Sequence, residues 1–593
     1  MNALQDQHVL ILGLGISGLS MARWCVRHGA QVTVADTRAN PPSLAALRAE
    51  CPSADFVAGA FDESLLARAA WNLIARSPGL PPEQLAPARE WALAHGAAFV
   101  GELDLFAQAL CDLSQREVLP YRPKVLAITG TNGKTTVTSL TGLLLQRAGL
   151  RVAVAGNIGP ALLDVLSAAL DAEREGEALD APRAAEAERE AAAQAPAAAP
   201  MDAAPAPETA EPQNETETAE PSEAGAEEEG PTLLVPPPPP EPEPPHLPQA
   251  WVLELSSFQL DGTAGGPWDR VPTAATVLNI TEDHLDWHGS MAAYAQAKAA
   301  VFGARALMLL NREDPRVSAM APGMVTVKIS GRNRQQPARP WTSFGLDTPV
   351  RAGDWGIESV NGMDWLVRAL ALDETRQRGR GQDADEEIYF QRLMPVDALR
   401  IRGRHNAANA LASLALATST GAPLAPMLHG LREYRGEPHR VEPVAILDDV
   451  EYFDDSKGTN VGATLAAIRG LGVDRRLVVI LGGDGKGQDF SPLAEPLARH
   501  ARAVVFIGRD GPKIREQIAA ALLQAEVPMD EVATMPEAVQ QSARLAKAGD
   551  AVLMSPACAS LDMFRDYKHR ADVFIEAVRA LADERGVSLE GQS

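Results

Sequence analysis

The sequence predicts an α/β protein made of several parallel-sheet domains. Its 593 residues exceed what one hydrophobic core supports, and typical domain sizes suggest about three or four units. Short apolar runs alternate with helix-length amphipathic stretches, which is typical of parallel α/β domains. Two of the apolar runs end directly in glycine-rich turns. Together these observations separate three α/β regions along the chain.

Each region contains short apolar runs that end at turns, and we interpret these runs as strands. The nine predicted strands are residues 9–12, 32–36 and 73–75 in the first region, 125–128, 251–254 and 275–278 in the second, and 477–481, 503–507 and 551–554 in the third. No repeat of solenoid period is visible, so the regions are expected to be separate domains.

A segment rich in Ala, Glu and Pro interrupts the second region between residues 168 and 248. It contains 20 acidic and 3 basic residues, so it carries −17 of the net charge of −24 and leaves −7 for the rest of the chain. With almost no large apolar side chains, it cannot bury enough surface to offset the entropy cost of ordering. We therefore expect a disordered insert, with transient helix around residues 184–193, that acts as a linker; a docking tail is the alternative.

The composition excludes several classes of protein. No apolar run approaches the ~18 to 20 residues that span a bilayer, and the N-terminus lacks the pattern of a signal peptide, so no membrane association is expected. The net charge of −24 would argue against a nucleic-acid partner if it were spread over the surface, but most of it belongs to the insert; no nucleic-acid partner is expected. Four scattered cysteines without C-x-x-C spacing suggest neither disulfides nor a zinc site, and they fit a reducing cytoplasm.

The first glycine-rich turn, residues 13–18, lies between a predicted strand and a helix, with Asp36 at the end of the next strand. This is the context of a dinucleotide fingerprint, in which glycines allow a tight turn and the helix N-terminus receives an anion. Taken alone, the pattern favours an NAD enzyme. A turn without a ligand is the alternative, because left-handed backbone geometry also requires glycine.

The second glycine-rich turn is a phosphate loop that predicts ATP binding. It precedes a helix expected near Val137 and has Gly-Lys-Thr in phosphate-loop order, although Ile128 stands where the common pattern opens with glycine. Backbone N–H groups would surround the phosphates, Lys134 would reach the β and γ oxygens, and the Thr135 hydroxyl would coordinate magnesium. The loop consists of Gly130, Thr131, Asn132, Gly133, Lys134, Thr135 and Thr136.

Polar residues end two further strands of the second region. Glu254 ends one strand, and the sequence Asn-Ile-Thr-Glu-Asp-His at residues 279–284 ends another. In open α/β sheets the carboxyl ends of the strands face the crevice where ligands bind. Glu254 and His284 could therefore reach a metal ion held by ATP, while a structural role is the alternative for a single histidine.

Four more loops follow strands or precede helices, at residues 403–409, 454–460, 482–486 and 555–562. Asn, His, Asp or Ser side chains ahead of a helix can serve as caps. The glycine and lysine content of residues 482–486 also suits an anion loop. Taken singly, each loop is as consistent with a structural role as with binding.

In combination and in this order, these motifs resemble the Mur ligase family. The resemblance covers the chain apart from the acidic insert and a weaker stretch at residues 331–392. The phosphate loop is common to the family. Residues 13–18, 36–38, 455–460 and 555–562 resemble the member that adds D-glutamate, whereas relatives that add other amino acids carry a Tyr/His/Asn-rich segment in place of the Asp-Ser-Lys loop.

The resemblance implies three domains: a Rossmann-like domain at residues 1–115 for the uridine nucleotide, a central ATP-binding domain at 116–436, and a C-terminal Rossmann-like domain at 437–593 for the amino acid. The first glycine turn would then hold UDP, and no nicotinamide is needed. The implied reaction is ATP-dependent addition of D-glutamate to UDP-N-acetylmuramoyl-L-alanine through an acyl phosphate. It would release ADP and phosphate during cytoplasmic peptidoglycan precursor synthesis, and we expect a monomer.

The resemblance also implies roles for single residues. Those implied near the UDP substrate are Ile16, Ser17, Asp36, Thr37, Arg38, Asn157 and Ser256. Those implied near ATP, besides the phosphate loop, are His405, Asn406, Asn409, Arg440 and Asp455. The D-glutamate pocket is implied at Lys457, Thr459, Lys486, Ser560, Leu561 and Tyr567.

Two magnesium ions are implied as well. The groups implied around them are Thr135, Glu254, His284 and a carbamylated Lys298, and the residues implied as catalytic are Lys134, His284 and Lys298. Without the resemblance, Lys298 would be interpreted as a lysine on a helix surface. Trp287 departs from the family pattern, which has arginine there, and Tyr567 stands where phenylalanine is frequent.

Two rival classes stay open. A folate-polyglutamate ligase shares the central domain but has no need of the glycine turn at residues 13–18. A nicotinamide oxidoreductase would use that turn but would leave the phosphate loop idle. Each rival leaves more of the sequence unexplained.

Overall fold

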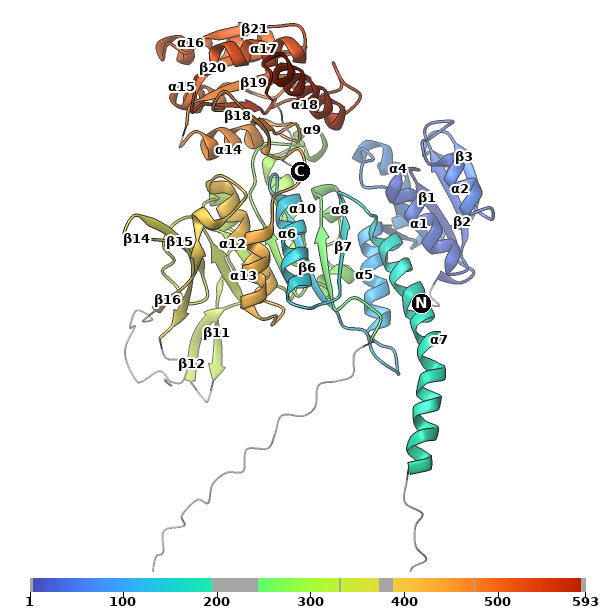
Figure 1. Ribbon diagram of the computed structural model, residues 1–593. Helices are drawn as coiled ribbons and strands as arrows, with labels where there is room; N and C mark the ends of the chain where they lie inside the picture. The colour runs from blue at the N-terminus through green and yellow to red at the C-terminus, as the bar shows by residue number, and fades with distance from the viewer. Residues whose placement is uncertain (1–3, 195–243, 330–331, 373–387, 474, 588–593) are drawn as a thin grey trace, which may run out of the picture.

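The computed structural model describes residues 4–194, 244–329, 332–372, 388–473 and 475–587. These residues form three α/β units that follow one another along the chain (Figure 1). Each unit is built on one sheet, and helices cover the sheet faces. The predicted α/β architecture in three parts is confirmed. The nine predicted strands are all present, with bounds that differ by one or two residues.

The first unit has a five-stranded parallel sheet in the order β3-β2-β1-β4-β5. Its strands are β1 (His8–Leu12), β2 (Gln31–Asp36), β3 (Asp55–Ala58), β4 (Leu73–Arg76) and β5 (Ala98–Gly101). Its helices are α1 (Ile16–Arg27), α2 (Leu44–Glu50), α3 (Glu63–Leu66), α4 (Pro82–His95) and α5 (Glu102–Leu113). The strand order reverses at β1, so the glycine turn that follows β1 lies at the point where α/β sheets bind ligands.

The second unit has a nine-stranded sheet in the order β16-β15-β14-β13-β10-β9-β6-β8-β7. Its parallel part contains β6 (Lys124–Thr129), β7 (Val152–Gly156), β8 (Ala250–Glu254), β9 (Ala274–Val277), β10 (Leu307–Asn311), β13 (Trp341–Phe344) and β14 (Trp355–Val360). Two antiparallel strands, β15 (Met363–Ala371) and β16 (Ile388–Pro395), extend it, and β11 (Met324–Ile329) pairs separately with β12 (Arg332–Pro337).

Helices of the second unit pack on both faces of this sheet. They are α6 (Lys134–Arg147), α7 (Leu162–Gln194), α8 (Ser257–Leu260), α9 (Leu285–His288), α10 (Met291–Ala299), α11 (Pro315–Ser318), α12 (Arg404–Thr418) and α13 (Leu424–Glu433). Along β6, Val125 and Ala127 join one buried cluster, while Leu126 and Ile128 join another. Because successive strand residues point to opposite faces, a continuous apolar run such as β6 is what a sheet covered on both sides requires.

The third unit has a six-stranded sheet in the order β17-β18-β22-β19-β20-β21, parallel except for the β17–β18 pair. Its strands are β17 (Glu442–Leu447), β18 (Val450–Asp454), β19 (Leu477–Gly482), β20 (Ala501–Ile507), β21 (Met529–Glu531) and β22 (Ala551–Met554). Its helices are α14 (Val461–Leu471), α15 (Ala494–His500), α16 (Gly511–Gln524), α17 (Met535–Leu545) and α18 (Tyr567–Glu584).

The first two units share one buried cluster. It contains apolar residues from β1 and α1 of the first unit together with residues from β6 and β8 of the second. On α5, the Phe106 ring packs edge-on against the Trp251 ring of β8, with centroids 5.1 Å apart. A continuous core of this kind holds the two units in a defined orientation. In the part of the chain that is described, no helix combines the length and the apolar content needed to cross a membrane.

The composition predicts disorder from residue 168 onward, and this prediction is wrong for the first part of the segment, because α7 extends to Gln194. Leu166 and Leu170 on this helix are buried, and Asp171 pairs with Arg27 at 2.6 Å. Glu173 is only 5% exposed and pairs with Arg116 at 2.7 Å. Apolar contacts and ion pairs to neighbouring helices thus order the first part of the segment, a long-range effect that composition does not reveal. Residues 195–243, which carry the rest of this prediction, lie outside the described residues.

Replacing only residues 195–243 with a flexible Gly/Ser linker is therefore expected to leave turnover within about twofold of the intact protein, since the contacts that hold α7 precede them. Removing residues 168–248 deletes buried Leu170 and Leu247 and is expected to lower thermal stability markedly. Thermal unfolding and phosphate release measured on both variants check this. Equal stability of the two deletions would contradict it.

Candidate active site

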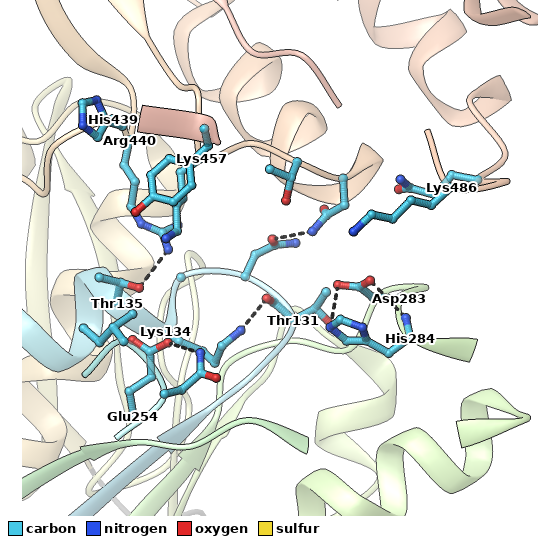
Figure 2. Close-up of a pocket in the computed structure, with 18 of the residues that line it drawn as sticks. Thr131, Lys134, Thr135, Glu254, Asp283, His284, His439, Arg440, Lys457 and Lys486 are labelled. Atoms are coloured by element: carbon cyan, nitrogen blue, oxygen red, sulfur yellow. Dashed lines mark hydrogen bonds and ion pairs between the residues drawn. The ribbon is translucent and has the colours of Figure 1, made fainter. Parts of the chain in front are cut away.

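A cleft of about 1000 Å³ lies between the carboxyl ends of the central strands and the third unit (Figure 2). Its walls come from segments that are far apart in the sequence. They include Thr131, Asn132, Gly133, Lys134, Thr135, Asn157, Glu254, Asp283, His284, His439, Arg440, Lys457, Thr459, Asn460, Lys486 and Tyr567. Thirteen of the predicted site residues line this cleft. Among the lining residues that were not predicted, Asp283, His439 and Asn460 contact predicted ones.

The phosphate loop connects β6 to α6. The helix begins at Lys134, three residues before the predicted start, because Gly133 caps it with a left-handed φ of 83°. A Cβ on Gly133 would lie 2.8 Å from Asn409 Oδ1, so the close approach of α12 also requires glycine there. The early start brings the side chains of Lys134 and Thr135 into the first helical turn, at the positive end of the helix dipole.

Lys134 points back over the loop. Its Nζ donates to the carbonyl oxygens of Gly130 at 2.9 Å and Thr131 at 2.8 Å. Removal from water lowers the pKa of Lys134, and the nearby carboxylate of Glu254 opposes this shift. An ammonium held in the loop by neutral carbonyl groups is ready to exchange them for a charged phosphate oxygen.

Residues 279–281, which follow β9, hold the loop in place. Asn279 Oδ1 accepts from the Asn132 N–H at 2.8 Å, and Asn279 Nδ2 donates to the Asn132 carbonyl at 3.0 Å. The Thr281 N–H donates to Thr131 Oγ1 at 3.0 Å, and that hydroxyl lies 3.1 Å from the Tyr294 hydroxyl. The loop is therefore preorganised by the neighbouring strand end.

Glu254 ends β8 inside the cleft wall and is 1% exposed. Asn157 Nδ2 donates to its Oε1 at 3.0 Å, whereas its Oε2 is buried without a hydrogen-bond partner. A buried carboxylate oxygen without a partner is costly unless a cation or solvent satisfies it. Together with the Thr135 hydroxyl in the same cleft, Glu254 offers the hard oxygen ligands that Mg²⁺ prefers, so these residues fit a magnesium ion.

Lys298 lies in α10 and is 2% exposed, so its interpretation as a helix-surface lysine is wrong. Its Nζ donates to the Gly130 carbonyl at 2.8 Å and lies 4.6 Å from the centre of the Tyr294 ring. Burial and, next, the charge of Lys134 hold the pKa of Lys298 well below its usual value. The lowered pKa favours the neutral amine, which is the form that reacts with carbon dioxide.

His284 follows the strand end in a left-handed conformation, with a φ of 53°. Its Nε2 lies 3.5 Å from Asp283 Oδ2, and its ring packs edge-on against Phe258 with centroids 4.7 Å apart. Burial lowers the pKa of His284, while Asp283 opposes the shift. Backbone strain of this kind at a non-glycine residue is frequent where a side chain must be aimed into a site.

The third unit reaches the phosphate loop through two side chains. Arg440, in the segment between α13 and β17, donates from Nη2 to Thr135 Oγ1 at 2.8 Å. Asn460, the N-cap of α14, places its Nδ2 3.4 Å from Asn132 Oδ1. Figure 2 shows Arg440 meeting Thr135 across the cleft. Both sides of the cleft are thus connected at the loop.

The remaining wall is basic. Lys457 lies 3.9 Å above the centre of the Tyr567 ring, a cation–π contact that keeps the ammonium inside the cleft. Lys486 comes from the loop after β19 and has a left-handed φ of 48°. Thr459 lines the cleft near them. Of the other residues predicted for the amino-acid pocket, Ser560 is buried and Leu561 is 70% exposed, and neither lines this cleft.

The residues predicted near adenosine occupy the start of α12 and the loop after β18. The interpretation of His405 and Asn406 as helix caps is wrong, because Gly403 is the N-cap and both lie in the first turn. His405 is half-buried and packs against Gly470 of α14, and its removal from water lowers its pKa to about 4. Asp455 is also buried, which raises its pKa to about 7, although it accepts from Ser555 Oγ at 2.6 Å.

The residues predicted for the UDP substrate lie in the first unit, apart from Asn157 and Ser256. Asp36 accepts the Leu14 N–H at 2.7 Å and pairs with Arg38 Nε at 2.8 Å, and the guanidinium lowers the pKa of Asp36 to about 2. Ile16 is 73% exposed, and Thr37 is exposed beside Asp36. Ser256 caps α8 with its hydroxyl. Asp36 therefore ties the glycine turn to the end of β2.

Trp287 joins the first two units. Its indole Nε1 donates to the Leu80 carbonyl at 3.1 Å, and its ring packs against Phe258 with centroids 5.0 Å apart. The tryptophan thus makes an apolar contact and a neutral hydrogen bond at the position where the family pattern has a guanidinium.

The sequence analysis omitted Asp283, His439 and Asn460 as site residues. Asp283 precedes His284 in residues 279–284, a segment that the sequence analysis placed at a strand end. Because neighbouring residues at a strand end face the same crevice, this signal could have identified Asp283. His439 Nδ1 lies 2.7 Å from Oδ2 of buried Asp454, and the His439 carbonyl accepts a hydrogen bond from the Lys457 N–H at 3.1 Å. No local signal could have found Asn460, because its partner is 328 residues away.

Comparisons with known proteins agree with this architecture. Three family descriptions match the chain: a Mur ligase MurD-like N-terminal domain at residues 7–101, a Mur ligase middle domain at 245–342, and a Mur ligase glutamate ligase domain at 439–558. The UDP-N-acetylmuramoylalanine--D-glutamate ligase of Albidiferax ferrireducens is 53% identical over 592 residues, which covers 100% of this chain and 99% of that protein.

Two further relatives with the same name are 49% identical. The protein of a Polaromonas species aligns over 99% of this chain and 100% of its own length, and that of Burkholderia mallei aligns over 99% of both. Among solved structures, the UDP-N-acetylmuramate-alanine ligase MurC of Thermotoga maritima is 16% identical, with a TM-score of 0.47, and covers 97% of this chain and 100% of its own.

Proposed function

The chain belongs to the Mur ligase family, and from this membership we propose that it adds D-glutamate to UDP-N-acetylmuramoyl-L-alanine at the expense of ATP. The names of its full-length relatives support this substrate pair. The observation that carries the proposal is the cleft itself, in which a phosphate loop faces a basic wall with Lys457 and Tyr567. It supports a reaction that joins an ATP-activated group to an acidic acceptor.

ATP is proposed to bind with its phosphates in the loop between β6 and α6. The backbone N–H groups of the loop and the N-terminus of α6 would hold the phosphate oxygens, and Lys134 would turn from its carbonyl partners to the β and γ oxygens. Asn409 lies beside Gly133 of the loop, Asn406 accepts a hydrogen bond from Asn409, and both would contact the nucleoside together with Asp455 from the loop after β18. Arg440 would move from Thr135 to the nucleotide.

Magnesium is proposed to bind at Thr135 and Glu254, with a second ion near His284 and Lys298. The buried Glu254 Oε2 without a partner supports the first position. When bound, magnesium would neutralise phosphate oxygens and so lower the charge repulsion against an approaching carboxylate. Asn157 holds Glu254 through its other oxygen, so one carboxylate oxygen stays available for the ion.

Lys298 is proposed to carry a carbamate. The modification needs an unprotonated amine near a cation, and the low pKa of Lys298 and its place behind the phosphate loop supply both conditions. Conversion of the amine into a carboxylate would also place an anion beside Lys134, so that an attraction takes the place of the like-charge repulsion that lowers the Lys298 pKa.

The UDP substrate is proposed to bind at the glycine turn of the first unit, where residues 13–18 follow β1 at the switch point of the sheet. Ile16, Ser17, Asp36, Thr37 and Arg38 would surround the nucleotide. Its muramoyl-alanine end would extend past Asn157 into the cleft. This places the carboxylate to be activated on the same side as the γ-phosphate.

The proposed chemistry follows from the leaving group. A carboxylate does not acylate an amine because oxide would have to leave, so its oxygen first attacks the γ-phosphorus and gives an acyl phosphate and ADP. The D-glutamate amine then attacks the acyl carbon, and phosphate leaves from a tetrahedral intermediate. Lys457 and Lys486 would hold the two carboxylates of D-glutamate, with Thr459 and Tyr567 beside them in the cleft. Ser560 and Leu561 lie outside the cleft lining, so their proposed contact with D-glutamate rests on the family resemblance alone.

The amino-acid dependence of phosphate release tests the proposal. With UDP-N-acetylmuramoyl-L-alanine, ATP and magnesium, phosphate release is expected only when D-glutamate is added, because the basic wall matches a second carboxylate. L-glutamate, L-lysine and diaminopimelate serve as comparisons. Release with L-lysine or diaminopimelate but not with D-glutamate would overturn the assignment. Because its four cysteines are all free, we also propose that the protein works in a reducing cytoplasm.

A further inference from the structure

Glu102, the first residue of α5, is a buried carboxylate that the proposed reaction does not use. It is 2% exposed and lies in the first unit, outside the cleft lining. Burial raises the pKa of Glu102, and three hydrogen-bond donors counter that effect. Burial of a carboxylate costs free energy even when donors surround it, so we expect a buried acid of this kind to serve the fold or the function.

The donors come from two other helices. On α1, the Ser20 hydroxyl donates to Glu102 Oε1 at 3.2 Å, and the nearby Ser17 hydroxyl helps to lower the pKa of the same carboxylate. On α7, the Leu163 N–H donates to Oε1 at 3.3 Å. The N–H groups in the first turn of a helix have no partner within that helix, so Glu102 serves as the acceptor that α7 lacks. The carboxylate, itself at the start of α5, therefore joins α1 to the N-terminal turn of α7.

Two of these helices follow directly after loops that carry proposed substrate contacts. The glycine turn at residues 13–18 leads into α1, and Asp36 already holds this turn from the other side through the Leu14 N–H. The loop before α7 begins with Asn157, whose amide holds the Glu254 carboxylate. The contacts of Glu102 thus run from the glycine turn of the first unit to the loop at the edge of the cleft.

We propose that Glu102 is a positioning residue for the UDP substrate: by joining Ser20 on α1 to Leu163 on α7, it fixes the glycine turn and the Asn157 loop relative to each other. This inference rests on the proposed function, which places the uridine diphosphate at the glycine turn. Glu102 does not touch the reacting atoms. It acts through the two loops whose spacing sets how well one extended substrate fits both.

Glu102→Gln tests the proposal, because it retains the side-chain size but removes the negative charge and replaces one of the two acceptor oxygens by an NH2 group that cannot accept. The KM for the UDP substrate and the Kd of UDP measured by calorimetry are expected to rise about fivefold. The KM for ATP and kcat are expected to stay within about twofold, since the phosphate loop is held by residues 279–281. In a Ser20→Ala background, Glu102→Gln is expected to add little, because the shared contact is already lost.

Glu173→Gln is the matched control. Glu173 is a similarly buried acid at the contact between α7 and its neighbours, but its partner is Arg116 and it touches no proposed substrate loop. It is expected to lower thermal stability without changing the Kd of UDP. If Glu102→Gln does not fold, Ser20→Ala removes one of the same contacts from α1 and is expected to weaken UDP binding selectively.

The outcomes separate this inference from the proposed function. Unchanged UDP affinity in Glu102→Gln, or changes in all kinetic constants parallel to a loss of stability as in Glu173→Gln, would overturn the positioning role alone. Failure of the unsubstituted protein to bind UDP or to use D-glutamate would instead overturn the proposed function.

Discussion

Replacement of Lys134 by alanine is expected to reduce ATP-dependent phosphate release by at least about a thousandfold. Lys134 is the cation that the loop holds over its own carbonyl groups, where its Nζ lies 2.9 Å from the Gly130 oxygen. Phosphoryl transfer places charge on oxygens that only preorganised cations can neutralise at this position, and water cannot substitute for the missing ammonium. Phosphate release at saturating ATP and D-glutamate measures the effect.

Lys124→Ala is the control for this substitution. Lys124 lies exposed at the opposite end of β6, so its removal tests the strand without changing the loop. It is expected to leave turnover within about twofold. Normal turnover of Lys134→Ala would mean that the loop does not hold the reacting phosphate.

Lys298→Ala is expected to lower turnover by about a hundredfold or more, with partial recovery when acetate or formate is added. A short carboxylate can enter the space left by the side chain and take the place of the proposed carbamate. Lys298→Arg is the matched variant, because it keeps a cation and fills the space, and it is expected to be inactive without recovery. Turnover of both variants with and without added carboxylate checks this.

The acidity of Lys298 also gives a pH dependence with a defined sign. Its folded pKa lies below the usual value, so the amine becomes protonated only as the pH falls through that lowered pKa. Carbamate formation and turnover are expected to decline together on that acidic side, and a ¹³C-labelled carbon dioxide NMR signal measures the carbamate. Full activity of Lys298→Ala without added carboxylate, or wild-type activity without the signal, would contradict the proposed modification.

The sequence determined the elements whose causes are local. Nine apolar runs became strands because alternate residues of a run such as β6 enter two different cores, a pattern that is visible in the chain itself. The phosphate loop and the glycine turn were also predictable, since their geometry depends on glycines within a few residues. The start of α6 was predicted three residues late because the left-handed cap at Gly133 has no signature of its own.

Tertiary structure alone decided what depends on contacts between distant segments. Three features come from packing between elements that are far apart in the sequence. They are the burial of Lys298, the contact of Arg440 with Thr135 across 305 positions, and the order in the first part of α7. Periodicity and composition describe a residue and its neighbours, whereas a pKa, a cation's partner or the order of a polar helix depends on what packs against it. For this reason the sequence named the loops that line the cleft, but only the fold showed which of them meet.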